Sequence, residues 1–406
     1  MPDDPEIELL PRRKAQGYRP EDLAHRRDWL TQRTGASLDN VGAHALDSLT
    51  MRGNIENPIG AAKVPLGVAG PLRVNGEHAQ GVFYVPMATT EGALLRSYER
   101  GMVVLTRAGG VQTRVLRDEN IACPLFLLPD TVAATEFVGW IEDHEASLRE
   151  LAESTTRHGR LLRMECTPVG RRVIVNFIYA TGDAHGMNMI VKATEAACRW
   201  IMQQTEAEHY IVLSGHGGEK RPTGALLAGG KGKKLIAGAS IPNALLQQYL
   251  RTDAQAMQSF WHSTIHAHLQ AASLGHNAQL ANGLAAIFIA TGQDVANVVN
   301  SAVGITSMEC TANGDLHVSV TLPSLSVATV GGGTQQGTAR ECLQLMDCLG
   351  SGKARRLAEI TAASLLAGEL SMAAALASGE FANAHETYGC LLYTSPSPRD
   401  KIANLV

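Results

Sequence analysis

The chain has 406 residues, of which 45% are hydrophobic, and it carries a formal net charge of −4 at pH 7. A chain of this length exceeds the usual size of one hydrophobic core, so two or three domains are expected. The charge balance excludes a global basic field for nucleic acid, and no uninterrupted apolar run approaches the ~18 residues of a membrane span. The N-terminus lacks the apolar core of a signal peptide, and seven scattered cysteines without a CxxC pair indicate reduced thiols. The sequence therefore predicts a cytoplasmic protein without a nucleic-acid or membrane partner.

The N-terminal residues 1–53 are polar and predict a helical segment. Within it, Glu21–Thr34 is rich in arginine and leucine and predicts one helix. The chain then becomes rich in glycine and proline over Met51–Gly70, where Gly67 and Gly70-Pro71 predict turns.

The stretch Val85–Gly92, with the sequence VPMATTEG, precedes an amphipathic run that predicts a helix over Ala93–Leu105. Its apolar residues fall on one stripe, which consists of Leu94, Tyr98, Met102 and Leu105. Glu91 is expected at or near the first turn, where a carboxylate ordinarily only stabilises the helix dipole. Val111–Arg117 predicts a strand, and the first part of a large domain is expected to span 54–123.

Residues 124–212 predict a separate unit whose elements follow the order β-α-β-β-α-β, which is the order of a ferredoxin-like module. The expected strands are Leu125–Leu128, Leu161–Thr167, Arg172–Thr181 and His209–Leu213, and the expected helices are Trp140–Ser154 and Met189–Gln204. The stretch Gly182–Met189 joins the third strand to the second helix. Backbone N–H groups at such a junction bind phosphate well. The stretch lacks the G-x-G-x-x-G fingerprint, so on its own it could be only a tight turn.

Residues 213–389 predict the second part of the large domain. The expected elements are the largely helical Ile241–His276, the small apolar segment Ala278–Ala290, a strand Leu316–Leu322, and the helices Arg340–Leu349 and Ala354–Ala377. Four histidines cluster in the first of these segments, namely His262, His266, His268 and His276. The first two share one helical face and could bind a metal. No glutamate of the HExxH kind accompanies them, so no metal site is expected.

Four motifs in chain order, PMATTEG, GDAHGMNM, GEKRP and ATGQD, are followed by GGGT and by the late histidine His385. Together they resemble the hydroxymethylglutaryl-CoA reductase family, most nearly its class I form, over about Glu56 to His385. The resemblance implies an α+β fold in which a helix-rich large domain binds CoA and substrate. It makes the ferredoxin-like unit at 124–212 an inserted cofactor domain. It also implies a homodimer or higher oligomer with shared active sites.

The resemblance implies four catalytic residues. Lys220 would stabilise the oxyanion that forms as hydride arrives. Asp294 would lie between Lys220 and Glu91, keep the lysine charged, and oppose ionisation of the glutamic acid by like-charge repulsion. Glu91 would supply a proton to the aldehyde. His385 would protonate the departing CoA thiolate.

The cofactor implied by the resemblance is NADPH, with NADH as the alternative. Thr156 and Arg157 match a hydroxyl and arginine pair that holds the 2′-phosphate, because a guanidinium suits a phosphate dianion. His185 stands where the family usually has methionine. The contacts expected from the glycine stretch are Asp183, Gly186, Met187 and Asn188.

The acyl-CoA substrate is expected to contact Ser214, Glu219, Arg221, Asn282 and Arg100. Two basic positions of the family are missing here. Ala122 stands where an arginine binds the carboxylate of the acyl group, and His262 falls near a supporting lysine.

Three functions therefore stay open. The chain could reduce hydroxymethylglutaryl-CoA to mevalonate with two NADPH, reduce another acyl-CoA, or be a non-catalytic CoA-binding paralogue. The retained catalytic residues favour the first. After Gly389 the tail at 390–406 shares nothing with the family pattern, and its SPSPRD resembles translated vector sequence, so it is expected to be non-native.

Overall fold

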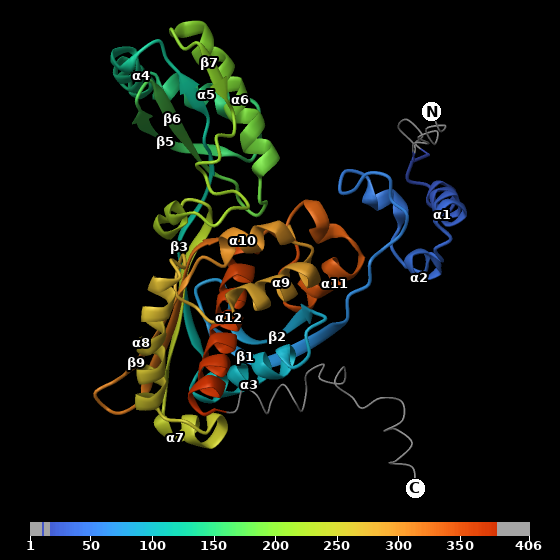
Figure 1. The fold of residues 1–406 in the computed structure, drawn as a ribbon, viewed down its shortest axis with the longest axis vertical. Coiled ribbons are helices and arrows are strands. Elements are labelled where there is room, and N and C mark those ends of the chain that lie inside the picture. The colour runs from blue at the N-terminus through green and yellow to red at the C-terminus, as the bar shows by residue number, and fades with distance from the viewer. Residues whose placement is uncertain (1–9, 12–16, 380–406) are drawn as a thin grey trace, which may run out of the picture.

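The computed structural model describes residues 10–11 and 17–379, in which a large body carries a smaller lobe at one end (Figure 1). His385 and the segment 390–406 lie outside these described residues, so what the sequence predicts for them stays a prediction. The helices α1 (Pro20–Thr34) and α2 (Asp39–Gly42) stand apart from the large body and are joined to it by an extended stretch (Figure 1).

The large body contains most of the described helices and strands. In chain order these are β1 (Leu66–Asn75), β2 (Gln80–Ala88), α3 (Leu94–Arg107), β3 (Val111–Ala122), β8 (Gly232–Ile241), α7 (Asn243–Leu245), α8 (Ala254–Gln270), α9 (Leu280–Thr291), α10 (Val298–Ser301), β9 (Ile305–Cys310), β10 (Leu316–Leu325), α11 (Gly337–Leu345) and α12 (Ala354–Ala377). The smaller lobe contains β4 (Leu125–Leu127), α4 (Thr131–Asp143), α5 (Glu145–Ser154), β5 (Arg160–Val169), β6 (Arg172–Ala180), α6 (Met187–Gln204) and β7 (His209–Ile211). Short 3₁₀ or π turns are η1 (Ser48–Met51), η2 (Gly224–Ala228), η3 (Leu246–Leu250), η4 (Val295–Asn297) and η5 (Gly332–Gln335).

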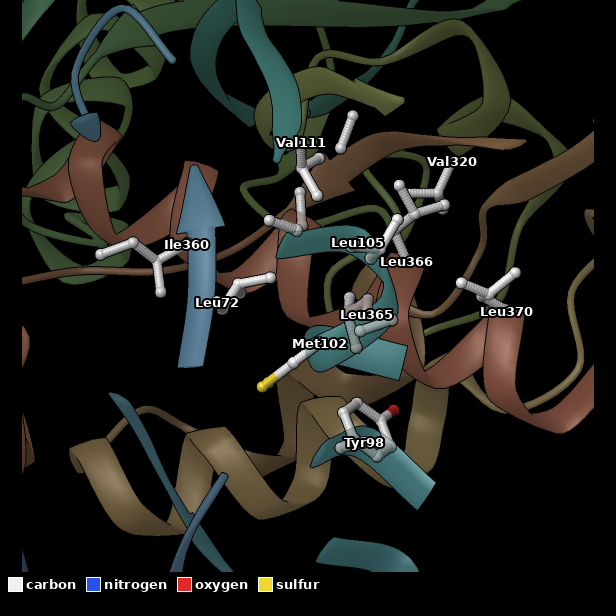
Figure 2. Close-up of a cluster of buried hydrophobic side chains, with 14 of the residues drawn as sticks. Leu72, Tyr98, Met102, Leu105, Val111, Val320, Ile360, Leu365, Leu366 and Leu370 are labelled. Carbon is white, nitrogen blue, oxygen red and sulfur yellow. The ribbon is translucent and has the colours of Figure 1, made fainter. Parts of the chain in front are cut away.

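The core of the large body forms where α3 meets α12. The stripe predicted on α3 is confirmed, because all four of its apolar residues are buried. Figure 2 shows three of them, Tyr98, Met102 and Leu105, in the same cluster as Leu365, Leu366 and Leu370 of α12. A Cβ atom on Gly101 would lie 2.0 Å from the carbonyl oxygen of Ala367, so the two helices approach along their backbones. This close approach explains small residues within both helices.

Helix α12 is long and apolar enough to cross a membrane by length and composition, although the sequence has no uninterrupted apolar run of that length. In its most apolar 18-residue stretch, 83% is buried inside the protein. Its apolarity is therefore that of a central core helix. Two carboxylates on it are also buried, and each accepts backbone N–H groups. Glu359 accepts those of Glu77, His78 and Ala79, and Glu369 accepts those of Ala278 and Gln279.

One long strand, β3, connects the two parts of the molecule. Its first half pairs with β1 in parallel and with β8 in antiparallel orientation. Its last residues, Asn120–Ala122, pair with β6 of the smaller lobe. The hydrogen-bonded order β7-β4-β6-β3-β8-β10-β9 therefore runs from the lobe into the large body.

The smaller lobe has its own hydrophobic cluster, which includes Phe126, Phe137 and Phe177. Its four strands are antiparallel in the order β7-β4-β6-β5. The helix predicted over Trp140–Ser154 is instead two helices, α4 and α5, which are separated at His144. Asp130 begins α4 by accepting the N–H groups of the next turn.

The turns predicted at Gly67 and at Gly70-Pro71 were wrong. Gly67 and Gly70-Pro71 lie inside strand β1, which pairs with β2 and accommodates an irregularity between Ala69 and Leu72. Local glycine and proline therefore marked a bulge and not the end of a strand. Strands β8 and β9 were not identified from the sequence. The lysines and glycines at the start of β8 masked an alternation of buried side chains that only strand pairing makes evident.

Candidate functional site

A pocket of about 810 Å³ lies where the smaller lobe meets the large body. Two loops contribute to it. The cofactor loop, residues 182–189, joins β6 to α6, and the substrate loop, residues 214–222, follows β7; both names follow the roles expected from the sequence. The lining includes Ala184–Met189, Glu219, Lys220, Gly292–Asp294, Asn297, Ser326, Ala328 and Val330–Thr334. The pocket thus combines both loops with the end of helix α9.

The structure brings Lys220 and Asp294 together in this pocket. The ammonium nitrogen of Lys220 lies 2.7 Å from a carboxylate oxygen of Asp294, and both side chains are 46% exposed. Lys220 has a left-handed backbone with φ +55°, and its N–H donates to Asn300 Oδ1 at 3.3 Å. The hydrogen bond to Asp294 is the main reason why the pKa of Lys220 is raised above its ordinary value. The ammonium is therefore held charged and remains accessible to a ligand.

Helix geometry positions Asp294. Helix α9 ends at Gly292, whose φ of +67° reverses the chain direction. Asp294 follows two residues later and accepts the N–H of Ala296 at 3.2 Å, so it also begins η4. A cap is the ordinary role of such an aspartate. Here one oxygen caps η4 while the other binds Lys220.

Glu91 lies between β2 and α3, outside the first turn of the helix. Its N–H donates to Thr89 Oγ1 at 3.0 Å, and Ala93, in a left-handed conformation with φ +69°, precedes the first helical residue. The Glu91 side chain is exposed and does not line the pocket. No contact joins it to Lys220 or Asp294, so its place beside their ion pair stays a prediction.

A second lysine beside the pocket was missed by sequence reasoning. Lys231 immediately precedes β8, and its side chain is 1% exposed. It forms an ion pair with Glu219, and its nitrogen lies 3.2 Å from the sulfur of Met187. Burial lowers the pKa of Lys231, and the charge of Glu219 partly offsets that effect. The run GGKGKK that contains it gave no signal beyond an ordinary charged turn.

His185 of the cofactor loop also lines the pocket. Its carbonyl oxygen accepts a hydrogen bond from Asn120 at 2.7 Å, which holds the loop against the end of β3. The ring atom Nε2 is buried and has no hydrogen-bond partner in the described part of the chain. Burial lowers the pKa of His185, which favours the neutral imidazole at neutral pH.

The N-terminus of α6 opens into the same pocket. Gly186 caps the helix with φ +73°, and Met187 and Asn188 form its first turn and line the pocket. Backbone N–H groups in a first turn have no partner within their own helix. Asp183 does not line the pocket. Its carboxylate accepts the N–H groups of Gly352 at 2.7 Å and Ala354 at 3.0 Å, so it holds the cofactor loop to the start of α12.

Thr156 and Arg157 lie in the turn between α5 and β5. The hydroxyl of Thr156 accepts the N–H groups of His158 and Gly159 at 3.2 and 3.1 Å. A Cβ atom on Gly159 would lie within 3.2 Å of both Thr156 and Met189, so this turn touches the first turn of α6. Arg157 is exposed, and no described residue pairs with its guanidinium.

A smaller cavity of about 160 Å³ adjoins the substrate loop. It brings Ser214, Glu219 and Arg221 together with Ile121, Cys123, Met187 and Leu213. Ala122 does not line it, because its side chain packs in the core of the smaller lobe. The wall supplied by the end of β3 is therefore apolar.

Two expected substrate residues line neither of these cavities. Arg100 on α3 donates to the hydroxyl and carbonyl oxygens of Ser371 at 3.0 and 2.7 Å. Asn282 lies in the first turn of α9. Both roles stay predictions.

The histidine cluster does not converge as metal ligands do. His276 Nε2 lies 2.9 Å from the hydroxyl of Thr264, and His268 Nδ1 lies 2.9 Å from the carbonyl oxygen of Thr264. Among the described residues, the one group with ligand atoms close enough for a metal is Glu77, His78 and Glu359. Glu359 already accepts three backbone N–H groups there.

Known proteins resemble this chain over most of its length. The sequence profile of the family described as hydroxymethylglutaryl-coenzyme A reductase matches residues 22–390. The 3-hydroxy-3-methylglutaryl-coenzyme A reductase of Methanocaldococcus jannaschii is 41% identical over 374 residues, which cover 90% of this chain and 92% of that protein. The corresponding protein of Methanothermobacter thermautotrophicus is 43% identical over 368 residues, with the same two coverages of 90% and 92%.

A solved structure shares the fold. It is the class II 3-hydroxy-3-methylglutaryl-CoA reductase of Streptococcus pneumoniae bound to NADPH in open conformations. The TM-score is 0.66 at 21% sequence identity, and the match covers 89% of this chain and 99% of that one. This likeness supports the mixed α and β architecture.

Proposed function

Because the chain belongs to the hydroxymethylglutaryl-coenzyme A reductase family, we propose that it reduces 3-hydroxy-3-methylglutaryl-CoA to mevalonate and CoA with two molecules of NADPH. One observation carries the proposal. A charged, accessible Lys220 is paired with Asp294 in the same pocket that receives the N-terminus of α6. A cation for a developing oxyanion and N–H groups for a phosphate are the two features that such a reduction needs.

The residues of the pocket fit a phosphorylated dinucleotide. The first turn of α6 offers N–H groups, and close to that turn Arg157 offers a guanidinium that pairs with no residue of the described ranges. The buried Nε2 of His185 is a polar atom that a ligand could satisfy. NADPH would be held by Thr156, Arg157 and Gly186–Asn188, and when bound it supplies hydride. NADH is the alternative, although it lacks the phosphate that Arg157 would bind.

The chain's own side chains would perform the remaining chemistry. Lys220 donates a hydrogen bond to the thioester oxygen and stabilises the negative charge that develops on it. Asp294 keeps that ammonium protonated through their hydrogen bond. Glu91 gives a proton to the aldehyde oxygen, and His385 gives one to the CoA thiolate after the carbon–sulfur bond breaks.

The proposed domain organisation follows the same assignment. An N-terminal segment at 1–53 precedes a large CoA-binding and substrate-binding domain at 54–123 and 213–389. A ferredoxin-like cofactor domain at 124–212 is inserted into it. The separate hydrophobic cluster and the antiparallel order β7-β4-β6-β5 support this assignment. We further propose a cytoplasmic homodimer or higher oligomer with shared active sites.

A related acyl-CoA is the second candidate substrate, because the cavity near the substrate loop has an apolar wall. Ile121 and Cys123 occupy that wall, and Ala122 faces the lobe's core. If the acyl group carries a carboxylate, Ser214 and Arg221 are the groups that would bind it.

The test compares two thioesters in an NADPH-oxidation assay with product analysis. Hydroxymethylglutaryl-CoA and an uncharged acyl-CoA of similar size are offered to the unmodified chain and to Arg221→Ala. We expect mevalonate from the first thioester, a strong preference for it, and loss of that preference in the variant. Equal turnover of both thioesters would exclude the mevalonate assignment. Binding of acyl-CoA without oxidation of NADPH would instead indicate a non-catalytic paralogue.

A further inference from the structure

Lys231 contacts both loops of the pocket at once. Its ammonium forms an ion pair with Glu219 of the substrate loop and lies 3.2 Å from the sulfur of Met187, at the end of the cofactor loop. The side chain that makes both contacts is 1% exposed. Lys231 belongs to neither loop, since it immediately precedes strand β8 of the large body.

We propose that Lys231 is a positioning residue that holds the substrate loop and the cofactor loop in one relative position at the end of β8. The inference rests on the proposed function only for what the two loops bind. The structure itself shows that one buried ammonium contacts both the cofactor loop and the substrate loop, which are separated along the chain by α6 and β7.

The energetics of burial explain why this contact is fixed. A buried ammonium is strongly destabilised unless a carboxylate neutralises it. Glu219 is the carboxylate that does so, and its side chain is only 22% exposed. Separation of the pair would leave the buried Lys231 ammonium without its carboxylate, so the pair resists separation.

The substrate loop needs a contact that holds it in one conformation, because its glycines give the backbone a wide choice of conformations. Gly215 and Gly218 have φ values of +91° and +69°, a region that glycine enters readily. Glu219 and Lys220 are adjacent, yet Glu219 binds Lys231 while Lys220 binds Asp294. Holding Glu219 therefore sets the direction of the Lys220 side chain.

Lys233 supplies a matched control. It lies two residues further along the chain, inside β8, and its side chain is 4% exposed. It pairs with Asp118 at 3.1 Å and donates to the carbonyl oxygen of Val327 at 3.4 Å. Neither partner belongs to either loop. Lys233→Met therefore removes a similarly buried cation and leaves the contacts of Lys231 with Glu219 and Met187 in place.

Hydrogen exchange of the full chain tests the proposal. Lys231→Met should accelerate amide exchange by about tenfold or more in both loops, because local opening becomes easier. Lys231→Arg should restore most of the protection, and Lys233→Met should leave both loops as they are. Unchanged exchange in Lys231→Met, or equal opening in Lys233→Met, would overturn the proposal.

Kinetics provide the second measurement. Lys231→Met should raise the KM values for NADPH and for the acyl-CoA together and lower kcat, whereas Lys233→Met should not. If the unmodified chain reduces no acyl-CoA, the proposed function fails and the exchange data still decide the role of Lys231. If Lys231→Met does not fold, Glu219→Gln breaks the same pair from its less buried side. Protection of the substrate loop that survives Glu219→Gln would then contradict the proposal.

Discussion

Two lysine–carboxylate pairs lie beside the pocket, and they differ in exposure. In the Lys220–Asp294 pair both side chains are 46% exposed, whereas the Lys231 side chain in its pair with Glu219 is 1% exposed. An exposed pair contributes little to stability, but its cation can still reach a ligand. A buried pair is costly to break by removing one partner, so it holds structure. Both pairs join an ammonium to a carboxylate, and the difference in burial is what separates the roles proposed for the two lysines.

The contrast arises within two consecutive residues. Glu219 turns inward to Lys231, and Lys220 turns outward to Asp294 from a left-handed backbone. Because the two neighbouring side chains point in different directions, one loop contributes both to a buried ion pair and to an exposed one.

The largest expected effect comes from removing the exposed lysine. Lys220→Met should lower kcat for acyl-CoA reduction by ~100-fold or more, because a preorganised donor to the oxyanion is lost. Its melting temperature should stay close to that of the unmodified chain, since the pair is half-exposed. Steady-state kinetics and thermal unfolding measure the two effects. Lys192→Met, which removes an exposed lysine on α6, is the control. Substantial turnover in Lys220→Met would reject its assignment.

A smaller effect is expected from removing Arg157, whose guanidinium pairs with no described residue, and Arg160 provides a paired arginine for comparison. Arg157→Ala should raise the KM for NADPH by roughly tenfold, the worth of a hydrogen bond between charged groups, with little change for NADH. Arg160→Ala removes a neighbouring arginine that is already paired with Glu153 at 3.1 Å, and it should change neither KM. Cofactor titrations with both nucleotides test this. A preference of the unmodified chain for NADH would show that Arg157 is not a phosphate ligand.

The smallest expected effect is on stability at high pH. The folded pKa of Lys220 is raised above its ordinary value of 10.5, mainly by the hydrogen bond to Asp294. The contribution of this group to stability is therefore present below pH 10.5 and is lost as pH rises through the raised value. The difference in melting temperature between the unmodified chain and Lys220→Met should therefore shrink as the pH rises above about 10.5. A difference that grows over this range would contradict the direction of the shift.

Local patterns in the sequence were enough for several parts of the fold. The apolar stripe of α3 and the alanine- and leucine-rich composition of α12 identified two helices that meet in the core, because residues that face the core recur with the helical period. The order of elements in the smaller lobe was also correct, except that one predicted helix is two. The motifs around Lys220 and Asp294 led to the residues that form an ion pair in the pocket.

Other features depended on contacts between distant segments. Gly67 and Gly70 resembled turns, and only pairing with β2 makes their segment a strand. The carboxylate of Asp183 holds the start of α12, which lies far along the chain. Both outcomes follow from partners that no local window contains.

The sequence by itself determined the family, the core helices and the motifs that contain Lys220 and Asp294, because these depend on composition, period and long motifs. Only the tertiary structure decided which charges are exposed and which are buried. Lys231 and Lys233 stand in an unremarkable basic run, and both are buried against partners from distant segments, which are Glu219 for the first and Asp118 for the second. The free energy of a charged group depends on its exposure to solvent and on its partners, and both are determined by the folded structure.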